Sequence, residues 1–218
     1  MEKVILYGTG KHAEIVYYYL VIEAKYEVVA FTVEEKYLTK PTLFDLPILP
    51  FEHLKQLLSP DDHAMFIAIG PQRLNRAREE HYTESKKRGY KLINWIGSNA
   101  LFSPDLIIGD NTFIGHGTGI HPFVRIGNDV SLIDAKIGHH CQIGNHVFIS
   151  NAILGGSVTI EDNVFIGMGS IIKENTTIGK GSIIGMGSII KEDVEPYSVY
   201  APAGTAKRNI SSKRISIF

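Results

Sequence analysis

The stretch from Ile160 to Ile190 reads IEDNVFIGMGSIIKENTTIGKGSIIGMGSII, with an isoleucine at every sixth position. The spacing extends back to residue 108 and gives the column Ile108, Ile114, Ile120, Ile126, Leu132, Ile137, Ile143, Ile149, Leu154, Ile160, Ile166, Ile172, Ile178, Ile184 and Ile190. An α-helix would place apolar residues at steps of three and four, and an ordinary strand would alternate with period two. The six-residue period is instead typical of a parallel β-helix, in which each hexapeptide forms one short strand and its turn. With three strands per coil, the fifteen positions predict a triangular β-helix of about five coils, with the aliphatic column as its core.

The repeat shortens to a step of five at two places, directly after Leu132 and directly after Ile149. The segment between these steps carries His139, His140 and His146. A strict repeat is most simply interrupted where a turn or a function requires it. We therefore expect this segment to contribute to a functional site.

Composition limits the class of protein. The chain has 218 residues, 44% of them hydrophobic, and a formal net charge of −1, which suits a soluble protein large enough for two domains. The sequence pI of about 6.8 gives no basic surface for nucleic acid. The single cysteine, Cys141, excludes an internal disulfide and is most simply a small buried residue. Without a signal peptide or a long apolar run, we expect a cytoplasmic protein with no membrane partner.

The N-terminal residues follow a different pattern. We expect strands at residues 3–8, 26–31, 64–70 and 92–96, and helices at residues 14–20, 51–58 and 73–87. Strands that alternate with helices predict a small open α/β sheet of the Rossmann-like kind. The predicted domains are therefore residues 1–97, a small α/β domain, and residues 98–218, a β-helix domain with a C-terminal tail.

A glycine-rich turn follows the first expected strand. Ligands of open α/β sheets bind at the carboxyl ends of the strands, where glycines and a helix N-terminus accept a phosphate. The candidate substrate-binding residues at these ends are Gly8, Thr9, Gly10, Lys11, His12 and Gly70. The alternative reading is tight strand–helix packing alone. Glu34 and Glu35 come late after the second expected strand, so a full NAD site is not predicted.

The glycine turn, the short α/β domain, the hexapeptide β-helix and the histidine pair together resemble the bacterial nucleotide-amino-sugar acetyltransferases of glycan assembly. The resemblance covers nearly the whole chain and includes the enzymes of pilin glycosylation and the sialic acid O-acetyltransferases. It implies a left-handed β-helix, a homotrimer with active sites between subunits, and acetyl-coenzyme A as co-substrate, with no metal. It also implies that the N-terminal domain holds a nucleotide-linked amino sugar.

The resemblance assigns roles to individual residues. His139 matches the general base, but His140 stands where the family has an acidic partner, a role that Asp134 or an acid of a neighbouring subunit would then have to fill. Phe148 matches a second histidine that helps to hold the acetyl group, and His146 is a further possible contact. The coenzyme A-binding positions match Gly167, Met168, Gly185 and Met186. Lys207 and Arg208 are expected in a solvated tail.

We therefore expect an acetyl-coenzyme A-dependent N-acetyltransferase that acts on a UDP- or dTDP-linked 4-amino-4,6-dideoxy sugar. The resemblance places it in bacterial surface-glycan synthesis, such as that of lipopolysaccharide O-antigen, with His139 and His140 as catalytic residues. Three alternatives stay open: an O-acetyltransferase, a non-catalytic sugar-nucleotide binding protein, and a zinc-dependent β-helix enzyme similar to carbonic anhydrase. The zinc ligands would come from His116, His121, His139, His140 and His146.

Overall fold

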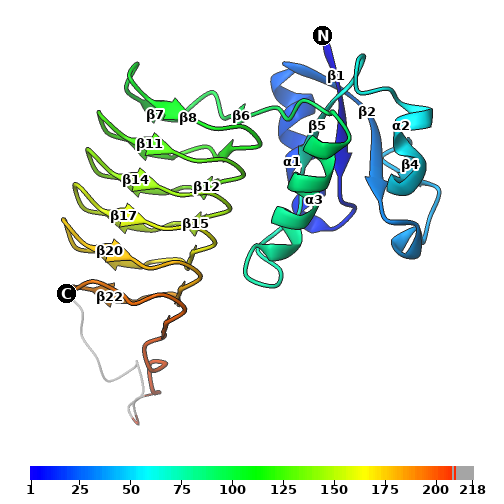
Figure 1. Ribbon diagram of the computed structural model, residues 1–218. Coiled ribbons are helices and arrows are strands. Elements are labelled where there is room, and N and C mark those ends of the chain that lie inside the picture. The colour runs from blue at the N-terminus through cyan, green and yellow to red at the C-terminus, as the bar shows by residue number, and fades with distance from the viewer. Residues whose placement is uncertain (208, 210–218) are drawn as a thin grey trace.

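The computed structural model describes residues 1–207 and 209, so Arg208 lies outside the described residues. Figure 1 shows two parts, an N-terminal α/β sheet and a stack of triangular coils that runs from green to orange. Within the described residues, no helix is long and apolar enough to cross a lipid bilayer.

The N-terminal sheet has five strands in the order β3-β4-β2-β1-β5. They are β1 (Glu2–Tyr7), β2 (Tyr26–Val33), β3 (Thr42–Leu43), β4 (Leu46–Pro50) and β5 (Ala64–Ile67). All pairs are parallel except β3 with β4. The helical segments are α1 (Lys11–Glu23), η1 (Glu35–Tyr37), η2 (Phe51–His53), α2 (Leu54–Leu57) and α3 (Arg76–Lys87). The chain leaves β1 toward β2 and β4 and returns to pair β5 with its other side, so the strand order reverses between β1 and β5.

The expected strands at 3–8, 26–31 and 64–70 are present. Of the fourth, expected at 92–96, only Trp95–Ile96 is a strand, and its expected place in this sheet was wrong. Leu92 makes only an isolated bridge to Met65, and the following strand β6 (Trp95–Ile96) pairs with a strand of the β-helix instead. The sheet gains β3 and β4, which the sequence did not predict, because Phe44 and Asp45 form their turn with φ of 49° and 62°. The β-helix thus begins before residue 97, which stays a proposed domain boundary.

The predicted parallel β-helix is present and has three faces, each a parallel sheet. The first face contains β6, β9 (Phe113–Ile114), β12 (Ser131–Ile133), β15 (Phe148–Ser150), β18 (Phe165–Ile166), β21 (Ile183–Ile184) and β23 (Val199–Tyr200). The second contains β7 (Leu101–Phe102), β10 (Gly119–Ile120), β13 (Lys136–Ile137), β16 (Ile153–Leu154), β19 (Ile171–Ile172) and β22 (Ile189–Ile190). The third contains β8 (Ile107–Ile108), β11 (Arg125–Ile126), β14 (Gln142–Ile143), β17 (Thr159–Ile160) and β20 (Thr177–Ile178).

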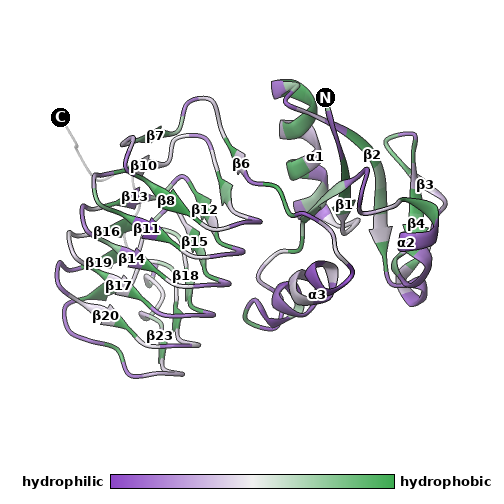
Figure 2. Cartoon of the chain, turned by 45° about the horizontal axis from the view of Figure 1, so that its top comes forward, coloured by the Kyte–Doolittle hydropathy of each residue, from purple (hydrophilic) through white to green (hydrophobic). Residues whose placement is uncertain are grey.

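The aliphatic column fills the interior of the β-helix. From Ile114 to Ile190 every member of the column is buried, and Ile108 packs against the same cluster. Strands β6 and β23 extend the stack beyond the predicted coils at both ends. Figure 2 shows the hydrophobic strands alternating with more hydrophilic corners along the coils. Apolar burial along one continuous column therefore stabilises the whole β-helix.

From Asn111 to Gly187, each corner of the β-helix turns at a residue in the left-handed region of backbone conformation. His140 and His146 occupy two of these corners, with φ of 60° and 57°. The two five-residue steps lie one coil apart at the corner between the first and second faces, where Asp134 and Asn151 turn the chain. Asn151 Nδ2 donates to Asp134 Oδ2 over 2.8 Å. The interruptions of the repeat therefore shorten this corner, and the corner of His139 and His140 keeps the usual length.

Helix α3 lies between the N-terminal sheet and the β-helix and is largely hydrophilic (Figures 1 and 2). Its Arg78, 1% exposed, reaches the corner residue Asp129, which is fully buried, with Nε 3.0 Å from Oδ2. The same guanidinium donates to the backbone oxygens of Asp129 and Val147. Asn111 Nδ2 and His146 Nδ1 also contact the Asp129 carboxylate, at 2.6 and 2.8 Å. A buried charge with this many partners fixes α3 to the coils.

Aromatic residues form a second contact between the two parts. Trp95, 1% exposed, stacks on Phe113 of β9 at a centroid distance of 4.6 Å and on Tyr19 of α1 at 4.9 Å. Trp95 and Phe113 belong to the buried cluster that includes the core of the N-terminal sheet. The sheet and the first coils therefore share one hydrophobic core.

Candidate active site

A cavity of about 760 Å³ opens at the carboxyl ends of β1, β2 and β5. All six predicted substrate-binding residues line this glycine-turn cavity: Gly8, Thr9, Gly10, Lys11, His12 and Gly70. Its other lining residues are Tyr7, Val33, Glu34, Lys36, Tyr37, Ala68, Ile69, Gln72, Arg73, Ala77, Glu80 and His81. The cavity lies where the strand order reverses, the place at which open α/β sheets bind their ligands.

Gly8 and Gly10 of the turn are glycines for different structural reasons. Gly8 has φ of 119°, and a Cβ there would lie 2.9 Å from the backbone oxygen of Ala68, so no side chain fits. Gly10 precedes α1 and provides no side-chain cap, which leaves the first N–H groups of the helix without helical acceptors. A Cβ on Gly10 would meet nothing within 4 Å. The turn therefore presents a helix N-terminus to open space, an arrangement suited to phosphate.

Charged side chains of both signs surround the cavity. Lys11, Lys36 and Arg73 supply positive charge, and Glu34 and Glu80 supply negative charge. Arg73 is paired with Glu80 through two hydrogen bonds of 2.8 and 2.9 Å. These cations lie around the glycine turn and can neutralise an anionic ligand there.

His12 connects this cavity with a second one. It lines both the glycine-turn cavity and a cavity of about 470 Å³ beside Phe113, His116 and Asp134. Burial, and then the charge of Arg78, lower the pKa of His12 to about 4. The imidazole is therefore neutral near pH 7, with one nitrogen as donor and the other as acceptor.

The second cavity continues along the corner between the first and second faces. Asp134 also lines a further cavity of about 260 Å³ with Asn151 and Gly169, and we call the two together the corner groove. Met168 and Met186 lie at this same corner, 57% and 69% exposed, and the N–H of Gly187 donates to the Met168 oxygen over 2.9 Å. The two Gly-Met-Gly segments are therefore stacked one coil apart, as their spacing predicted.

His139 and His140 lie at a different corner, between β13 on the second face and β14 on the third, and both are exposed. Their Nδ1 atoms are 3.0 Å apart. The N–H of His140 donates to the oxygen of Pro122, and its ring packs on Phe123 with centroids 4.7 Å apart. The coil position beside the His139 ring is Gly156, where a Cβ would lie 2.5 Å from its Cε1. Gly156 was not among the predicted site residues, although the doublet Gly155-Gly156 marks a position that excludes side chains.

Other candidates lie elsewhere. Asp134 pairs with Asn151 in the corner groove, so the idea that it partners His139 within one chain was wrong. His146 contacts Asp129 beside α3, and Phe148 packs between His12 and Phe165 with centroid distances of 6.3 and 5.8 Å. Both residues therefore lie in the contact with the N-terminal part, and their coenzyme role stays a prediction.

Cys141 is fully buried, as expected, and burial raises the pKa of its thiol. A thiolate nucleophile is therefore disfavoured at this position. Among the described residues, no three His, Cys, Asp or Glu side chains of one chain come together as metal ligands.

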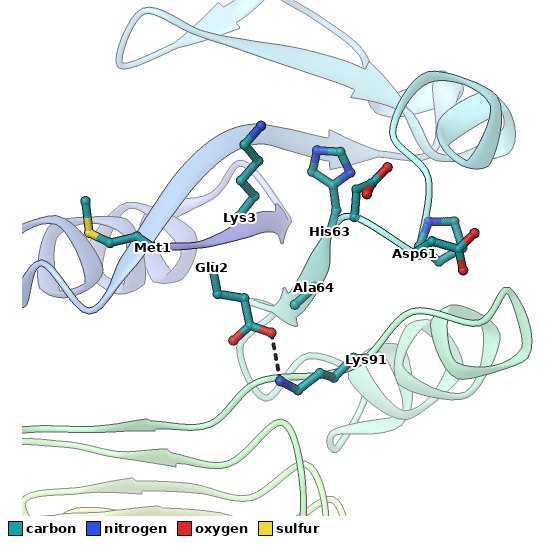
Figure 3. A pocket seen from close by; sticks show the side chains of 9 residues that line it. Met1, Glu2, Lys3, Asp61, His63, Ala64 and Lys91 are labelled. Atoms are coloured by element: carbon teal, nitrogen blue, oxygen red, sulfur yellow. Dashed lines mark hydrogen bonds and ion pairs between the residues drawn. The ribbon is translucent and has the colours of Figure 1, made fainter.

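Figure 3 shows a different cavity, lined by Met1, Glu2, Lys3, Pro60, Asp61, Asp62, His63, Ala64 and Lys91. Glu2 and Lys91 form an ion pair of 2.7 Å across it. Because β1 begins at Glu2 and β5 at Ala64, this cavity lies at the amino ends of the strands. None of the predicted site residues lines it, and ligands of such sheets bind at the opposite ends.

Two family models match the β-helix. Residues 157–192 match the model described as "Bacterial transferase hexapeptide (six repeats)", and residues 105–132 match the "Hexapeptide repeat of succinyl-transferase". With the three parallel sheets, these repeats indicate a left-handed β-helix of the acyltransferase type.

One curated relative is the GDP-perosamine N-acetyltransferase of Escherichia coli O157:H7, 38% identical over 91 residues. That match covers 38% of this chain and 41% of the relative, so the chain aligns with less than half of the relative's length.

Solved structures align over most of the chain. The acetyltransferase domain of PglB from Neisseria gonorrhoeae FA1090 has a TM-score of 0.83 at 25% identity, over 91% of this chain and 96% of that one. PerB from Caulobacter crescentus, in complex with CoA and GDP-perosamine, has a TM-score of 0.79 at 23% identity, over 90% and 92%. The arrangement of an N-terminal α/β sheet on a β-helix is therefore shared with proteins of known structure.

Proposed function

Because this chain is a hexapeptide-repeat protein of the kind found in nucleotide-amino-sugar acetyltransferases, we propose that it transfers the acetyl group of acetyl-coenzyme A to the amine of a nucleotide-linked amino sugar. One observation carries the proposal: a phosphate-type glycine-turn cavity and an exposed histidine pair occur on one chain whose β-helix is of the acyltransferase type. The acceptor is a 4-amino-4,6-dideoxy sugar of bacterial surface-glycan synthesis.

The glycine-turn cavity binds the nucleotide part of the acceptor in a Rossmann-like manner. The α1 N-terminus faces the diphosphate, and Lys11 and Arg73 line the same cavity. The family resemblance implies a UDP- or dTDP-linked sugar, and the names of the relatives add GDP. The sugar then extends past His12 toward the corner groove, which shares His12 with the cavity.

The corner groove and the stacked methionines bind coenzyme A. Met168 and Met186 form an exposed apolar strip, with Gly167 and Gly185 beside them. A flexible pantetheine arm gains contact with thioether side chains of this kind. The strip ends toward His12, so the thioester reaches the sugar amine at the junction of the groove and the cavity.

His139 accepts the proton of the attacking amine. The short contact between its Nδ1 and that of His140 accommodates one hydrogen, and donation from His139 to His140 leaves the His139 Nε2 lone pair free. His140 thereby takes the orienting place of the acidic residue in related enzymes. The amine attacks the thioester carbonyl directly, the thiolate leaves, and no acyl-enzyme is formed. A positioned base contributes about 10²–10⁴-fold to such a rate.

The two halves of this site come from neighbouring subunits. In one chain the N-terminal part packs on the first face. His139 lies between β13 and β14, at the corner opposite that face. The exposed isoleucines Ile153, Ile171 and Ile189 form a stripe on the second face, and its burial favours assembly. A homotrimer brings His139 of one copy to the groove and cavity of the next.

The test is free-thiol release from acetyl-coenzyme A with a panel of UDP-, dTDP- and GDP-linked amino sugars. We expect turnover with an amino sugar, a loss of about 10²-fold or more in His139→Ala, and the same melting temperature for both proteins. A Cβ at Gly10 would meet nothing within 4 Å, so Gly10→Val should weaken sugar binding and leave coenzyme binding intact. Turnover that survives His139→Ala would refute its role as the base. Turnover only with hydroxyl acceptors would make the protein an O-acetyltransferase.

A further inference from the structure

Glu34 is the first residue after β2 and lines the glycine-turn cavity. The ends of β1 and β2 are level, because Tyr7 is paired with Thr32 and the N–H of Gly8 donates to the Thr32 oxygen over 2.8 Å. Neighbouring strands lie about 4.8 Å apart, so Glu34 lies beside the glycine turn. From the sequence we expected this strand to end at Phe31, two residues before its actual end at Val33. For that reason Glu34 seemed too far beyond the strand to contact a ligand.

The carboxylate of Glu34 is held near the cavity and keeps the capacity to bind a ligand. Its Oε1 accepts from Lys36 Nζ over 3.2 Å, its Oε2 lies 4.0 Å from His81 Nε2, and the side chain is 28% exposed. Two carboxylate oxygens offer about four acceptor positions, so these contacts leave room for hydroxyl donors.

The arrangement matches a general pattern of nucleotide recognition. In sheets that open with Gly-x-Gly-x-x-Gly or Ala, an acidic residue about 20 residues later accepts a hydrogen bond from the ribose 2′-hydroxyl. Gly8, Gly10 and Ala13 supply the turn here, and Glu34 follows at the end of the next strand. We propose that Glu34 binds the 2′-hydroxyl of the acceptor's nucleoside, so that the substrate is a ribonucleoside diphosphate sugar and not a dTDP sugar. This inference rests on the proposed function.

Direct binding of free nucleotides tests the inference without requiring turnover. Isothermal titration calorimetry would compare UDP with 2′-deoxy-UDP and GDP with 2′-deoxy-GDP, so that each pair differs only in the hydroxyl. A hydrogen bond to a charged group corresponds to about 10- to 100-fold in affinity. We expect the wild type to favour the ribonucleotide of a bound pair by this factor.

Variants of Glu34 test whether its side chain causes the preference for ribonucleotides over deoxynucleotides. Glu34→Ala and Glu34→Gln should lower ribonucleotide affinity toward the deoxynucleotide value and leave the deoxynucleotide nearly unchanged. The matched control is Glu35→Gln, which changes the adjacent carboxylate outside the cavity lining. Equal binding of both members of a pair by the wild type would overturn the inference, as would a ratio that persists in Glu34→Ala. A variant that changes the preference between bases and keeps the ribose preference would also overturn it.

The outcomes separate this inference from the proposed function. Acetyl transfer to an amino sugar with no preference for the 2′-hydroxyl would refute the role of Glu34 alone. Failure of every nucleotide to bind would refute the nucleotide site as well as the inference.

Discussion

His139 and His140 meet because of the shape of the corner that carries them. His140 adopts a left-handed backbone conformation, which histidine tolerates better than a β-branched residue does. Its N–H is held by Pro122 and its ring by Phe123. The Nδ1 contact between the two rings is thus set by local backbone geometry. A single glycine on the adjacent coil, Gly156, leaves the room for the His139 ring.

Gly156→Ala should separate catalysis from folding. A Cβ at this position would lie 2.5 Å from the exposed His139 ring, so the ring has to move while the coil keeps its core. We expect acetyl transfer to fall by about 10²-fold or more, with little change in melting temperature. The matched control is Gly119→Ala, whose Cβ would meet Lys136 at an ordinary 3.5 Å. Full activity in Gly156→Ala would show that the ring position seen here is not the catalytic one.

His12 makes stability depend on pH in a defined direction. Its pKa is lowered from 6.5 to about 4 by burial and by Arg78, so the unfolded chain binds the proton first as pH falls. The stability associated with neutral His12 is complete above pH 6.5 and is lost progressively toward pH 4, by about 3 kcal/mol. Urea unfolding at pH 7, 5.5 and 4.5 should show His12→Gln losing less stability than wild type over this range. Parallel pH curves for the two proteins would contradict the prediction, and His53→Gln controls for loss of an exposed imidazole.

At the scale of elements, the regular repeat was predictable and the contacts between elements were not. An aliphatic residue at every sixth position has one structural solution, so the coils followed directly from the sequence. The hairpin of β3 and β4 escaped prediction because Phe44 and Asp45 replace the Asn-Gly usual in such turns.

The candidate site was predictable to a similar degree. The glycine turn could be identified because its residues are adjacent in the sequence. In the structure all of them line one cavity. The contact of Arg78 with Asp129 could not be predicted, because the two residues are 51 positions apart in the chain. Glu34 was not predicted as a site residue because the expected end of β2 was two residues early. Local propensity defines the ends of strands poorly.

The buried ion pair gives α3 a testable role. Arg78→Met leaves the fully buried Asp129 without its cationic partner, and the loss of one member of such a pair costs about 3–5 kcal/mol. The double variant Arg78→Met with Asp129→Asn removes both charges and should recover part of that loss, because Asn also accepts a left-handed backbone. Urea denaturation of wild type, the single variants and the double variant measures the coupling. Purely additive losses would mean that the pair does not act as a unit.

At the scale of the whole molecule, the proposed activity depends on assembly, because the cavity and His139 lie on different sides of one β-helix. Ile171→Glu introduces a charge in the middle of the exposed isoleucine stripe. We expect the variant to sediment as a single chain of 24.2 kDa and to lose acetyl transfer, while it still binds nucleotide. Ile171→Val keeps the apolar surface and should behave as wild type. A variant that is monomeric and fully active would place the whole site within one subunit.

The stacked aromatic junction has a practical consequence. Trp95 is the only tryptophan of the chain, and it is buried between Tyr19 of α1 and Phe113 of the first coils. Its indole fluorescence therefore reports from one place, the contact of the sheet with the β-helix. A red shift of emission that precedes the loss of β-structure in circular dichroism would reveal that the two parts separate before the coils unfold.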